Sequence, residues 1–224
     1  MLLKLPSVLD PNQLDTVRKL LVNASFVDGK LSAGDAAKRV KQNQELDKRA
    51  QQVDLLNNIV MRSLVQHPVY RAGALPLHVA APLYARYTPG MAYGDHLDDP
   101  IMGADGMLYR SDIAITVFLN EPEKYDGGEL VIRTAFGENR VKFPAGDAVM
   151  YPSSSLHQVS QVTRGERLVA VTWVQSLVRD PARRELLYEL HQAREKLLKI
   201  SPEAEETAQV NTAYMNLIRM WGDI

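Results

Sequence analysis

Three side chains in this sequence have the types and the spacing of a metal site. His96 and Asp98 stand two residues apart, just after a Pro-Gly turn. Alternate side chains of an extended strand point to the same face, so this imidazole and this carboxylate point the same way. His157 is a candidate for a second imidazole from elsewhere in the fold. Two imidazoles and one carboxylate on one side of an iron(II) ion leave positions open, as oxygen chemistry with a chelating cosubstrate requires.

A surface pair of residues is the competing interpretation, because an isolated His-X-Asp tripeptide is common. The preceding turn, the later His157, and Arg167 ten positions beyond it favour the metal site. The other histidines lack this context: His67 precedes a proline, His78 opens an apolar strand, and His191 falls in a helical run. We expect these three to be structural or solvated.

The same residues carry a resemblance to a known family. The matching features, in order over residues 78–178, are Tyr87-x-Pro-Gly-x-x-Tyr-Gly-Asp-His96-x-Asp98, Phe118-Leu-Asn, Gly127-Gly128-Glu129-Leu, Gly146-Asp147, His157, Arg167 and Trp173. In these features the chain resembles the bacterial PKHD-type hydroxylases. Those are iron(II)- and 2-oxoglutarate-dependent dioxygenases related to prolyl 4-hydroxylases. The metal-binding pattern shows no departure from that family.

The resemblance implies a hydroxylase that uses dioxygen and decarboxylates 2-oxoglutarate to succinate. It implies that iron(II) is held by His96, Asp98 and His157, which are then the catalytic residues. It also implies that ascorbate acts as a reductant that restores over-oxidised iron. The substrate is left open between a protein side chain and a siderophore-like small molecule.

The cosubstrate residues also follow from the resemblance. Arg167 would bind the distal carboxylate of 2-oxoglutarate, for which a guanidinium offers a permanently charged, bidentate fork. Trp173 shares a strand face with Arg167 and would line the floor of the pocket. Tyr87 would lie near the cosubstrate. Without the resemblance, Arg167 could equally be a surface arginine and Tyr87 a core tyrosine.

Two other functions stay open at this stage. One is a non-catalytic jelly-roll module that senses iron, and the other is a cupin-type iron dioxygenase that needs no 2-oxoglutarate. Arg167 argues against both, because neither has a use for a buried cation beside the metal.

Composition sets broad limits on the class of protein. A chain of 224 residues with 46% hydrophobic residues can bury one sizeable core. A net charge of −1 gives no long-range attraction to nucleic acid or to an anionic membrane. The absence of cysteine excludes disulfides and thiolate metal sites. No apolar run approaches membrane-spanning length, and the N-terminal apolar stretch is too short for a signal peptide, so we expect a cytoplasmic protein.

Residues 1–77 are predicted to form a helical flank. Asp10-Pro11 has the residues of a helix start, and a longer helix is predicted over residues 45–65, ended by His67-Pro68. The polar segment 31–44 reads as a solvated loop. As an alternative, its basic part, residues 38–43, borders the mouth of the active site.

Residues 78–178 are predicted to form the core. Apolar residues there recur with a period of two between Gly, Pro, Asn and Asp turns, which is typical of short strands. About eight such strands favour a double-stranded β-helix, or jelly roll, whose mouth holds a ligand. The run 112–119 is apolar throughout, so we expect it to be covered on both faces. The fold class is therefore α+β, with helices flanking a jelly roll.

Residues 179–224 are predicted to form a C-terminal helical hairpin. Apolar residues recur at helical spacing over 181–200 and again over 203–221. Such stripes need a partner surface, which is either the barrel of the same chain or a second subunit in a homodimer.

Overall fold

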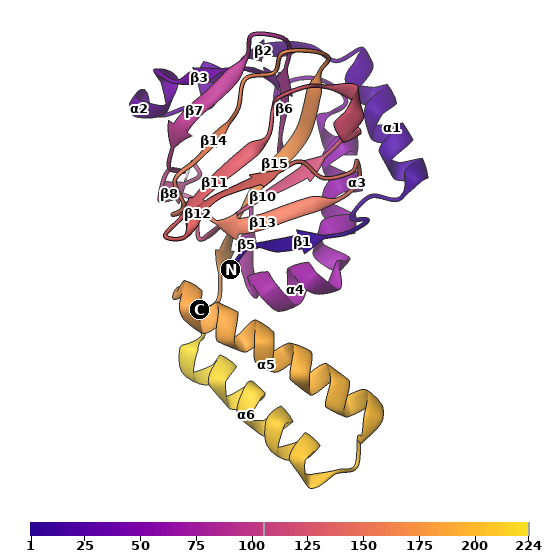
Figure 1. Ribbon diagram of the computed structural model, residues 1–224, viewed down its shortest axis with the longest axis vertical. Coiled ribbons are helices and arrows are strands. Elements are labelled where there is room, and N and C mark those ends of the chain that lie inside the picture. The colour runs from indigo at the N-terminus through magenta and orange to yellow at the C-terminus, as the bar shows by residue number, and fades with distance from the viewer. Residues whose placement is uncertain (105, 224) are drawn as a thin grey trace.

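The computed structural model describes residues 1–104 and 106–223, and two antiparallel sheets facing each other form its core (Figure 1). Helices cover the outer face of the larger sheet, and two further helices follow the sheets at the C-terminus. This arrangement confirms the predicted α+β jelly roll with flanking helices.

The larger sheet has eight strands and the smaller one has five. The main path of the larger sheet runs, in spatial order, through β1 (Leu3–Leu5), β13 (Ala148–Pro152), β10 (Ile113–Phe118), β15 (Arg167–Ser176), β6 (Leu83–Tyr87), β4 (Gln44–Leu46) and β2 (Phe26–Asp28), and β5 (Pro76–Val79) also pairs with β15. The smaller sheet runs through β12 (Gly137–Val141), β11 (Leu130–Thr134), β14 (His157–Val159), β7 (Ala92–His96) and β3 (Lys41–Gln42). A separate two-stranded hairpin consists of β8 (Ile101–Met102) and β9 (Tyr109–Arg110).

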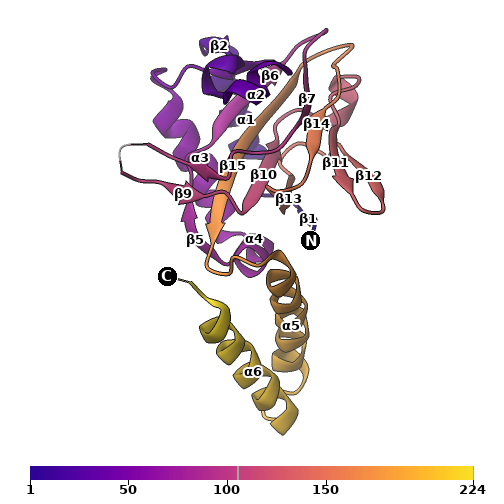
Figure 2. The same cartoon turned by 90° about the vertical axis from the view of Figure 1, so that its left-hand side faces the viewer.

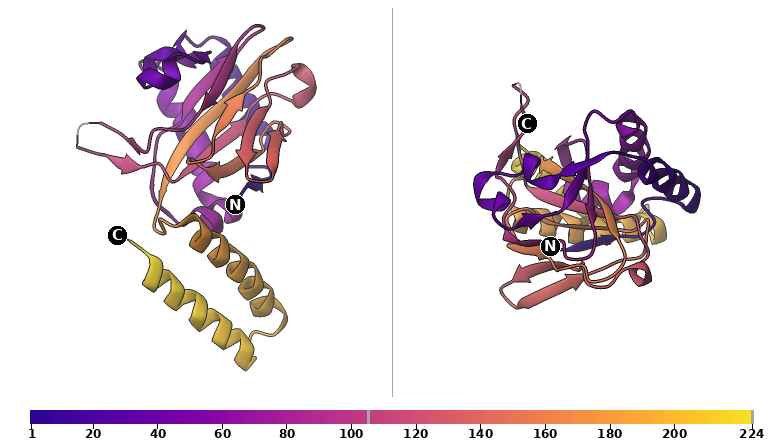
Figure 3. Two further views of the ribbon diagram at one scale, coloured as in Figure 1. Left: turned by 60° about the vertical axis from the view of Figure 1, so that its left-hand side comes forward. Right: turned by 90° about the horizontal axis from the view of Figure 1, so that it is seen from above.

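The helices lie outside the sheets (Figures 1 and 3). They are α1 (Pro11–Val22), α2 (Asp35–Lys38), α3 (Val53–Gln66), α4 (Pro68–Ala74), α5 (Pro181–Ile200) and α6 (Glu205–Trp221), with short 3-10 turns η1 (Gly29–Ser32) and η2 (Pro122–Lys124). The predicted start of α1 is confirmed: the Asp10 side chain accepts from the Gln13 amide, and the Gln13 side chain accepts from the Asp10 amide.

β10 is covered on both faces, as predicted for the apolar run 112–119. All of its residues are buried. Ile115 and Val117 belong to the apolar cluster that includes α1 and α3 on the outside of the sheet. Ala114 and Phe118 belong to the cluster between the two sheets.

The helix predicted over residues 45–65 is wrong in its first part, because the chain there is paired in a sheet. Glu45 belongs to β4, where it pairs with Val27 and with Ala85. α3 begins only at Val53. The solvated loop predicted over 31–44 is likewise wrong in part, because this segment contains the short helix α2, the strand β3 and the start of β4.

α4 was not expected from the sequence. The prediction that α3 ends at His67-Pro68 is confirmed, but Pro68 also occupies the first position of a new helix. This helix ends at Leu75, whose φ of 43° is left-handed.

The C-terminal helices form an antiparallel hairpin that extends away from the sheets (Figures 1 and 2). Leu187 of α5 and Tyr214 of α6 are buried together in one cluster. Val178, which lies in the segment after β15, belongs to the same cluster. The apolar stripes therefore pack largely against each other, and α5 also contacts α4. In the described part of the chain, no helix has the length and apolar content needed to cross a membrane.

Candidate metal centre and its cavity

The smaller sheet places the two histidines of the predicted metal site next to each other. His96 ends β7 and His157 begins β14, and the two residues are directly paired between these antiparallel strands. Their ring centroids lie 4.2 Å apart. Asp98 follows β7, with its Oδ1 atom 3.9 Å from Nε2 of His157. One potential ligand atom from each of the three residues lies within 4.8 Å of those of the other two.

Backbone carbonyls hold both imidazole rings in place. Nδ1 of His96 lies 2.8 Å from the carbonyl oxygen of Gly94, and Nδ1 of His157 lies 2.9 Å from that of Ser155. A proton on Nδ1 donates these bonds, which leaves the lone pair of each Nε2 for a metal. The Tyr93 ring stacks on the His96 ring at 3.5 Å and supports its orientation.

The protein environment favours uncharged imidazole at His96. Burial, followed by the nearby His157, lowers the pKa of His96 to about 3. Burial raises the pKa of the Asp98 carboxyl, while His157 and the indole N–H of Trp173 act in the opposite direction. A neutral imidazole can bind a metal without first releasing a proton.

The lowered pKa of His96 predicts a pH dependence of the metal-free protein. Below pH 6.5 the unfolded chain takes up a proton at His96 that the folded chain does not accept until about pH 3, so acid favours unfolding. The contribution of neutral His96 is present above pH 6.5 and is lost as the pH falls. We expect the free energy of unfolding in urea, measured without metal, to decline less steeply between pH 6.5 and about pH 5 in His96→Gln than in wild type. Equal slopes would contradict this.

The donor set fits iron(II). Two imidazole nitrogens and one carboxylate oxygen on one side of a site form the facial arrangement typical of non-haem iron oxygenases. Asp98 also has a buried second oxygen, Oδ2, that finds no hydrogen-bond partner among the described residues. Charge on a metal compensates for burying such a group.

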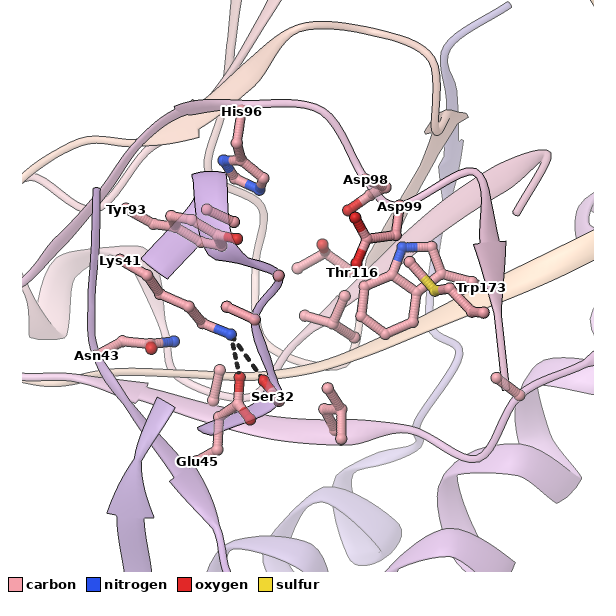
Figure 4. Close-up of a pocket in the computed structure, with 18 of the residues that line it drawn as sticks. Ser32, Lys41, Asn43, Glu45, Tyr93, His96, Asp98, Asp99, Thr116 and Trp173 are labelled. Atoms are coloured by element: carbon pink, nitrogen blue, oxygen red, sulfur yellow. Dashed lines mark hydrogen bonds and ion pairs between the residues drawn. The ribbon is translucent and has the colours of Figure 1, made fainter. Parts of the chain in front are cut away.

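The three residues line a cavity of about 600 Å³ that lies between the two sheets. Figure 4 shows His96 and Asp98 on one side of it and Lys41, Asn43 and Glu45 on another. A volume of this size is typical of pockets that hold a whole small ligand.

Arg167 is a buried cation at the edge of this cavity. It begins β15 and is only 2% exposed. Its guanidinium carbon lies 5.0 Å from the centre of the Tyr87 ring and 5.9 Å from that of Phe118. It forms no salt bridge with any described residue, and its Nε has no hydrogen-bond partner there. Such a charge is costly unless a ligand pairs with it.

The two glycines of the Gly127-Gly128 motif lie where the chain packs closely beside Arg167 and the segment at Gln161. Both have positive φ, 70° and 66°. A Cβ on Gly128 would stand 3.0 Å from Cδ of Arg167, and one on Gly127 would stand 1.9 Å from the carbonyl oxygen of Gln161. The pair therefore allows the chain to approach the arginine and its neighbouring segment closely.

Tyr87 and Trp173 both line the cavity. Tyr87 is buried, and burial raises its pKa to about 12, so its hydroxyl stays protonated at neutral pH. The ring of Tyr87 packs against Arg167. Trp173 lies beside Asp98, and its indole nitrogen has no hydrogen-bond partner among the described residues (Figure 4).

The remaining histidines stay outside the metal group. Nε2 of His67 lies 2.9 Å from the carbonyl oxygen of Pro6. His191 packs with Tyr214 in the C-terminal hairpin, and His78 packs with Tyr109.

Several cavity residues were missed from the sequence. Tyr93 lies inside the sequence motif that ends at Asp98, but the motif predicts no role for it, and Glu45 falls in the stretch predicted to be helical. The alternative for residues 38–43 holds in part: Lys41 and Asn43 are buried in the cavity wall, whereas Lys38 and Arg39 are not among its lining residues. Further lining residues without a predicted role include Thr116, Tyr109 and Tyr151.

Two family profiles match the chain. Residues 82–175 match the 2OG-Fe(II) oxygenase superfamily, and residues 181–223 match the PKHD-type hydroxylase C-terminal domain. A PKHD-type hydroxylase of Thioalkalivibrio sulfidiphilus is 53% identical over the full length of both chains.

Solved structures share the fold at low sequence identity. A prolyl hydroxylase of Trichoplax adhaerens, in complex with a hypoxia-inducible-factor oxygen degradation domain peptide, is 16% identical with a TM-score of 0.57, over 83% of this chain and 86% of that one. HygX of Streptomyces hygroscopicus, with nickel, 2-oxoglutarate and hygromycin B bound, is 14% identical with a TM-score of 0.53, over 79% and 84%.

Proposed function

The chain belongs to the PKHD-type hydroxylases, which are iron(II)- and 2-oxoglutarate-dependent oxygenases, and from this we propose a role for each residue of its active site. His96, Asp98 and His157 hold iron(II). Arg167 binds the distal carboxylate of 2-oxoglutarate, with Tyr87 beside it. Trp173 lines the floor of the cavity beside Asp98.

The observation that best supports this proposal is that Arg167 is buried without a partner of opposite charge among the described residues. Its guanidinium is buried, it lines the same cavity as the three metal ligands, and it has no carboxylate partner among the described residues. The distal carboxylate of 2-oxoglutarate supplies the missing charge in a bidentate geometry. An iron sensor or a cupin-type dioxygenase without 2-oxoglutarate has no use for such a cation, so both alternatives are disfavoured.

Each protein group has a separate task in the reaction. Iron, when bound, supplies the oxygen chemistry. The carbonyls of Gly94 and Ser155 hold the Nδ1 protons and aim both imidazoles. Arg167 sets the position of the cosubstrate, and apolar side chains of the cluster between the two sheets line part of the cavity.

An anaerobic titration tests these roles together. We expect the iron(II)-loaded protein to develop a visible metal-to-ligand absorption band when 2-oxoglutarate is added, because the keto acid chelates the metal. The band should saturate at one 2-oxoglutarate per chain. An iron-loaded protein that shows no spectral change would contradict the assignment.

The substrate proposal keeps both classes, a protein side chain and a small molecule. Of two relatives with the same fold, one is in complex with a peptide and the other has hygromycin B bound. A cytoplasmic location and the use of ascorbate remain predictions from the sequence and the resemblance.

We also propose that the chain forms a homodimer through its C-terminal hairpin. The hairpin stands away from the sheets (Figure 2). Some of its apolar side chains stay exposed after its own packing: Leu186 is 57% exposed and Ile200 is 75% exposed. Both lie on α5, and a second copy of the chain could cover them.

We expect Leu186→Glu combined with Ile200→Glu to halve the mass measured by light scattering, because two charges would be buried in the interface. Leu55→Glu is the matched control, since Leu55 lies on α3 and is 50% exposed. A wild-type protein that is monomeric at high concentration would show that the hairpin has only a packing role.

A further inference from the structure

The cavity has a second polar wall, formed by the segment that links β3 to β4. Lys41 in β3 pairs with Tyr93 in the smaller sheet, and Glu45 in β4 pairs with Ala85 in the larger sheet. Residues 41–45 therefore cross from one sheet to the other beside the cavity. The side chains of Lys41 and Glu45 are only 7% and 9% exposed, and both residues line the cavity.

These two side chains form a closed ion pair that still has hydrogen-bonding capacity. Nζ of Lys41 donates to Oε1 of Glu45 at 2.6 Å and to the hydroxyl of Ser32 at 2.9 Å (Figure 4). An ammonium group has three N–H donors, and a carboxylate has two oxygens. The third N–H of Lys41 and Oε2 of Glu45 form no hydrogen bond with the described residues. The pair thus keeps one free donor and one free acceptor, side by side.

The pair lies close to the metal site without belonging to it. Nζ of Lys41 lies 5.2 Å from the centre of the Tyr93 ring, and that ring stacks on His96. Iron(II) is accounted for by its three ligands, and the distal carboxylate of 2-oxoglutarate by Arg167. Stability does not explain the pair either, because a buried ion pair can often be replaced by apolar side chains without loss.

We infer that Lys41 and Glu45 form a subsite for the substrate that is hydroxylated, and that this subsite takes a neutral amide group. The inference rests on the proposed function, since it names the chemistry of that enzyme's substrate.

Charge and hydrogen bonding select an amide. The pair has no net charge, so a charged group placed against it would be buried without a counter-charge. A group with only a donor or only an acceptor would leave one partner of the pair unsatisfied. A primary amide satisfies both, because its carbonyl oxygen and one of its N–H groups lie on the same edge: the N–H donates to Oε2 of Glu45 and the carbonyl accepts from Nζ of Lys41. The amide side chain of a protein and a small-molecule primary amide share this chemistry.

Two probes of the same size test the subsite: butyramide, and 2-pentanone, in which a methyl group replaces the amide nitrogen. They are compared by ligand-observed saturation-transfer NMR on the zinc(II)-loaded protein with saturating 2-oxoglutarate, since zinc prevents turnover. We expect wild type to prefer the amide at least about fivefold. In the double variant Lys41→Met/Glu45→Met the preference should vanish, while 2-oxoglutarate affinity, which depends on Arg167, is kept. Lys38→Met, an exposed lysine outside the cavity, should behave as wild type.

A second variant keeps the test decisive if the double variant does not fold. Glu45→Gln leaves Lys41 without its counter-charge, so the preferred probe should change from the amide to the butyrate anion. Equal binding of the amide and the ketone to wild type, or an amide preference that survives in Lys41→Met/Glu45→Met, would overturn the inference. Failure of wild type to bind 2-oxoglutarate would overturn the proposed function and this inference with it.

A capped amino acid identifies the source of the amide. N-acetylglutamine N-methylamide that binds at least tenfold more tightly than butyramide assigns the subsite to an amide side chain of a protein. Any smaller gain assigns it to a small-molecule amide. Either result supports the subsite.

Discussion

Asp98→Ala should lower the affinity for iron(II) by more than about a hundredfold and abolish turnover. Loss of a group that merely orients a ligand costs about 10–100-fold, so loss of a ligand itself should cost more. Of the three ligand residues found in the described part of the chain, Asp98 alone is an anion, and the two remaining imidazoles cannot neutralise the charge of the metal. Anaerobic calorimetric titration with iron(II) measures the effect.

The matched controls for this change are His67→Ala and His191→Ala. Both histidines lie outside the metal group, with His67 on a backbone carbonyl and His191 against Tyr214. We expect both variants to bind one iron(II) per chain as wild type does. Unaltered iron affinity in Asp98→Ala would end the metal assignment.

Arg167→Ala should weaken 2-oxoglutarate at least tenfold and leave iron affinity nearly unchanged. A charge-assisted bond to a carboxylate contributes about 1.5–3 kcal/mol, and the carboxylate left in the cavity would then be buried without a partner. Arg167→Lys should recover only part of the affinity, because a point charge cannot form the fork. The dependence of uncoupled 2-oxoglutarate decay on its concentration gives the measurement before any substrate is known.

Two further variants separate this role from a structural one. Arg164→Ala removes an exposed arginine that pairs with Asp126, and it should leave 2-oxoglutarate binding unaltered. Arg167→Met keeps most of the side-chain volume and removes an unpaired buried cation, so the ligand-free protein should be at least as stable as wild type. An Arg167→Ala protein that binds 2-oxoglutarate as wild type does would favour the sensor or cupin alternative.

The metal triad could be predicted because its signal is local. His96 and Asp98 are close in sequence beside a strand with a period of two, and the later His157 is one of few candidates in the chain. The role of Arg167 follows only from the family resemblance, because its local sequence fits a surface arginine equally well. The burial of β10 on both faces could be predicted from its local sequence, because its apolar residues do not alternate with charged ones.

The Lys41–Glu45 pair could not be predicted, because its burial depends on contacts between distant strands. Glu45 begins a stretch whose apolar spacing suits a helix, yet its backbone pairs with residues of β2 and β6. Long-range pairing therefore overrides the local pattern. Lys41 is buried because β3 joins the edge of the smaller sheet, where it pairs with β7. The residues next to Lys41 in the sequence give no sign of this pairing.

The most direct test of the central claim is the release of succinate from 2-oxoglutarate by the purified protein. The account predicts that succinate forms only when iron(II), dioxygen and 2-oxoglutarate are all present, at one succinate for each 2-oxoglutarate consumed. It also predicts that Asp98→Ala produces none. A wild-type protein that binds one iron(II) per chain and 2-oxoglutarate but forms no succinate, with or without amide-containing candidate substrates, would contradict it.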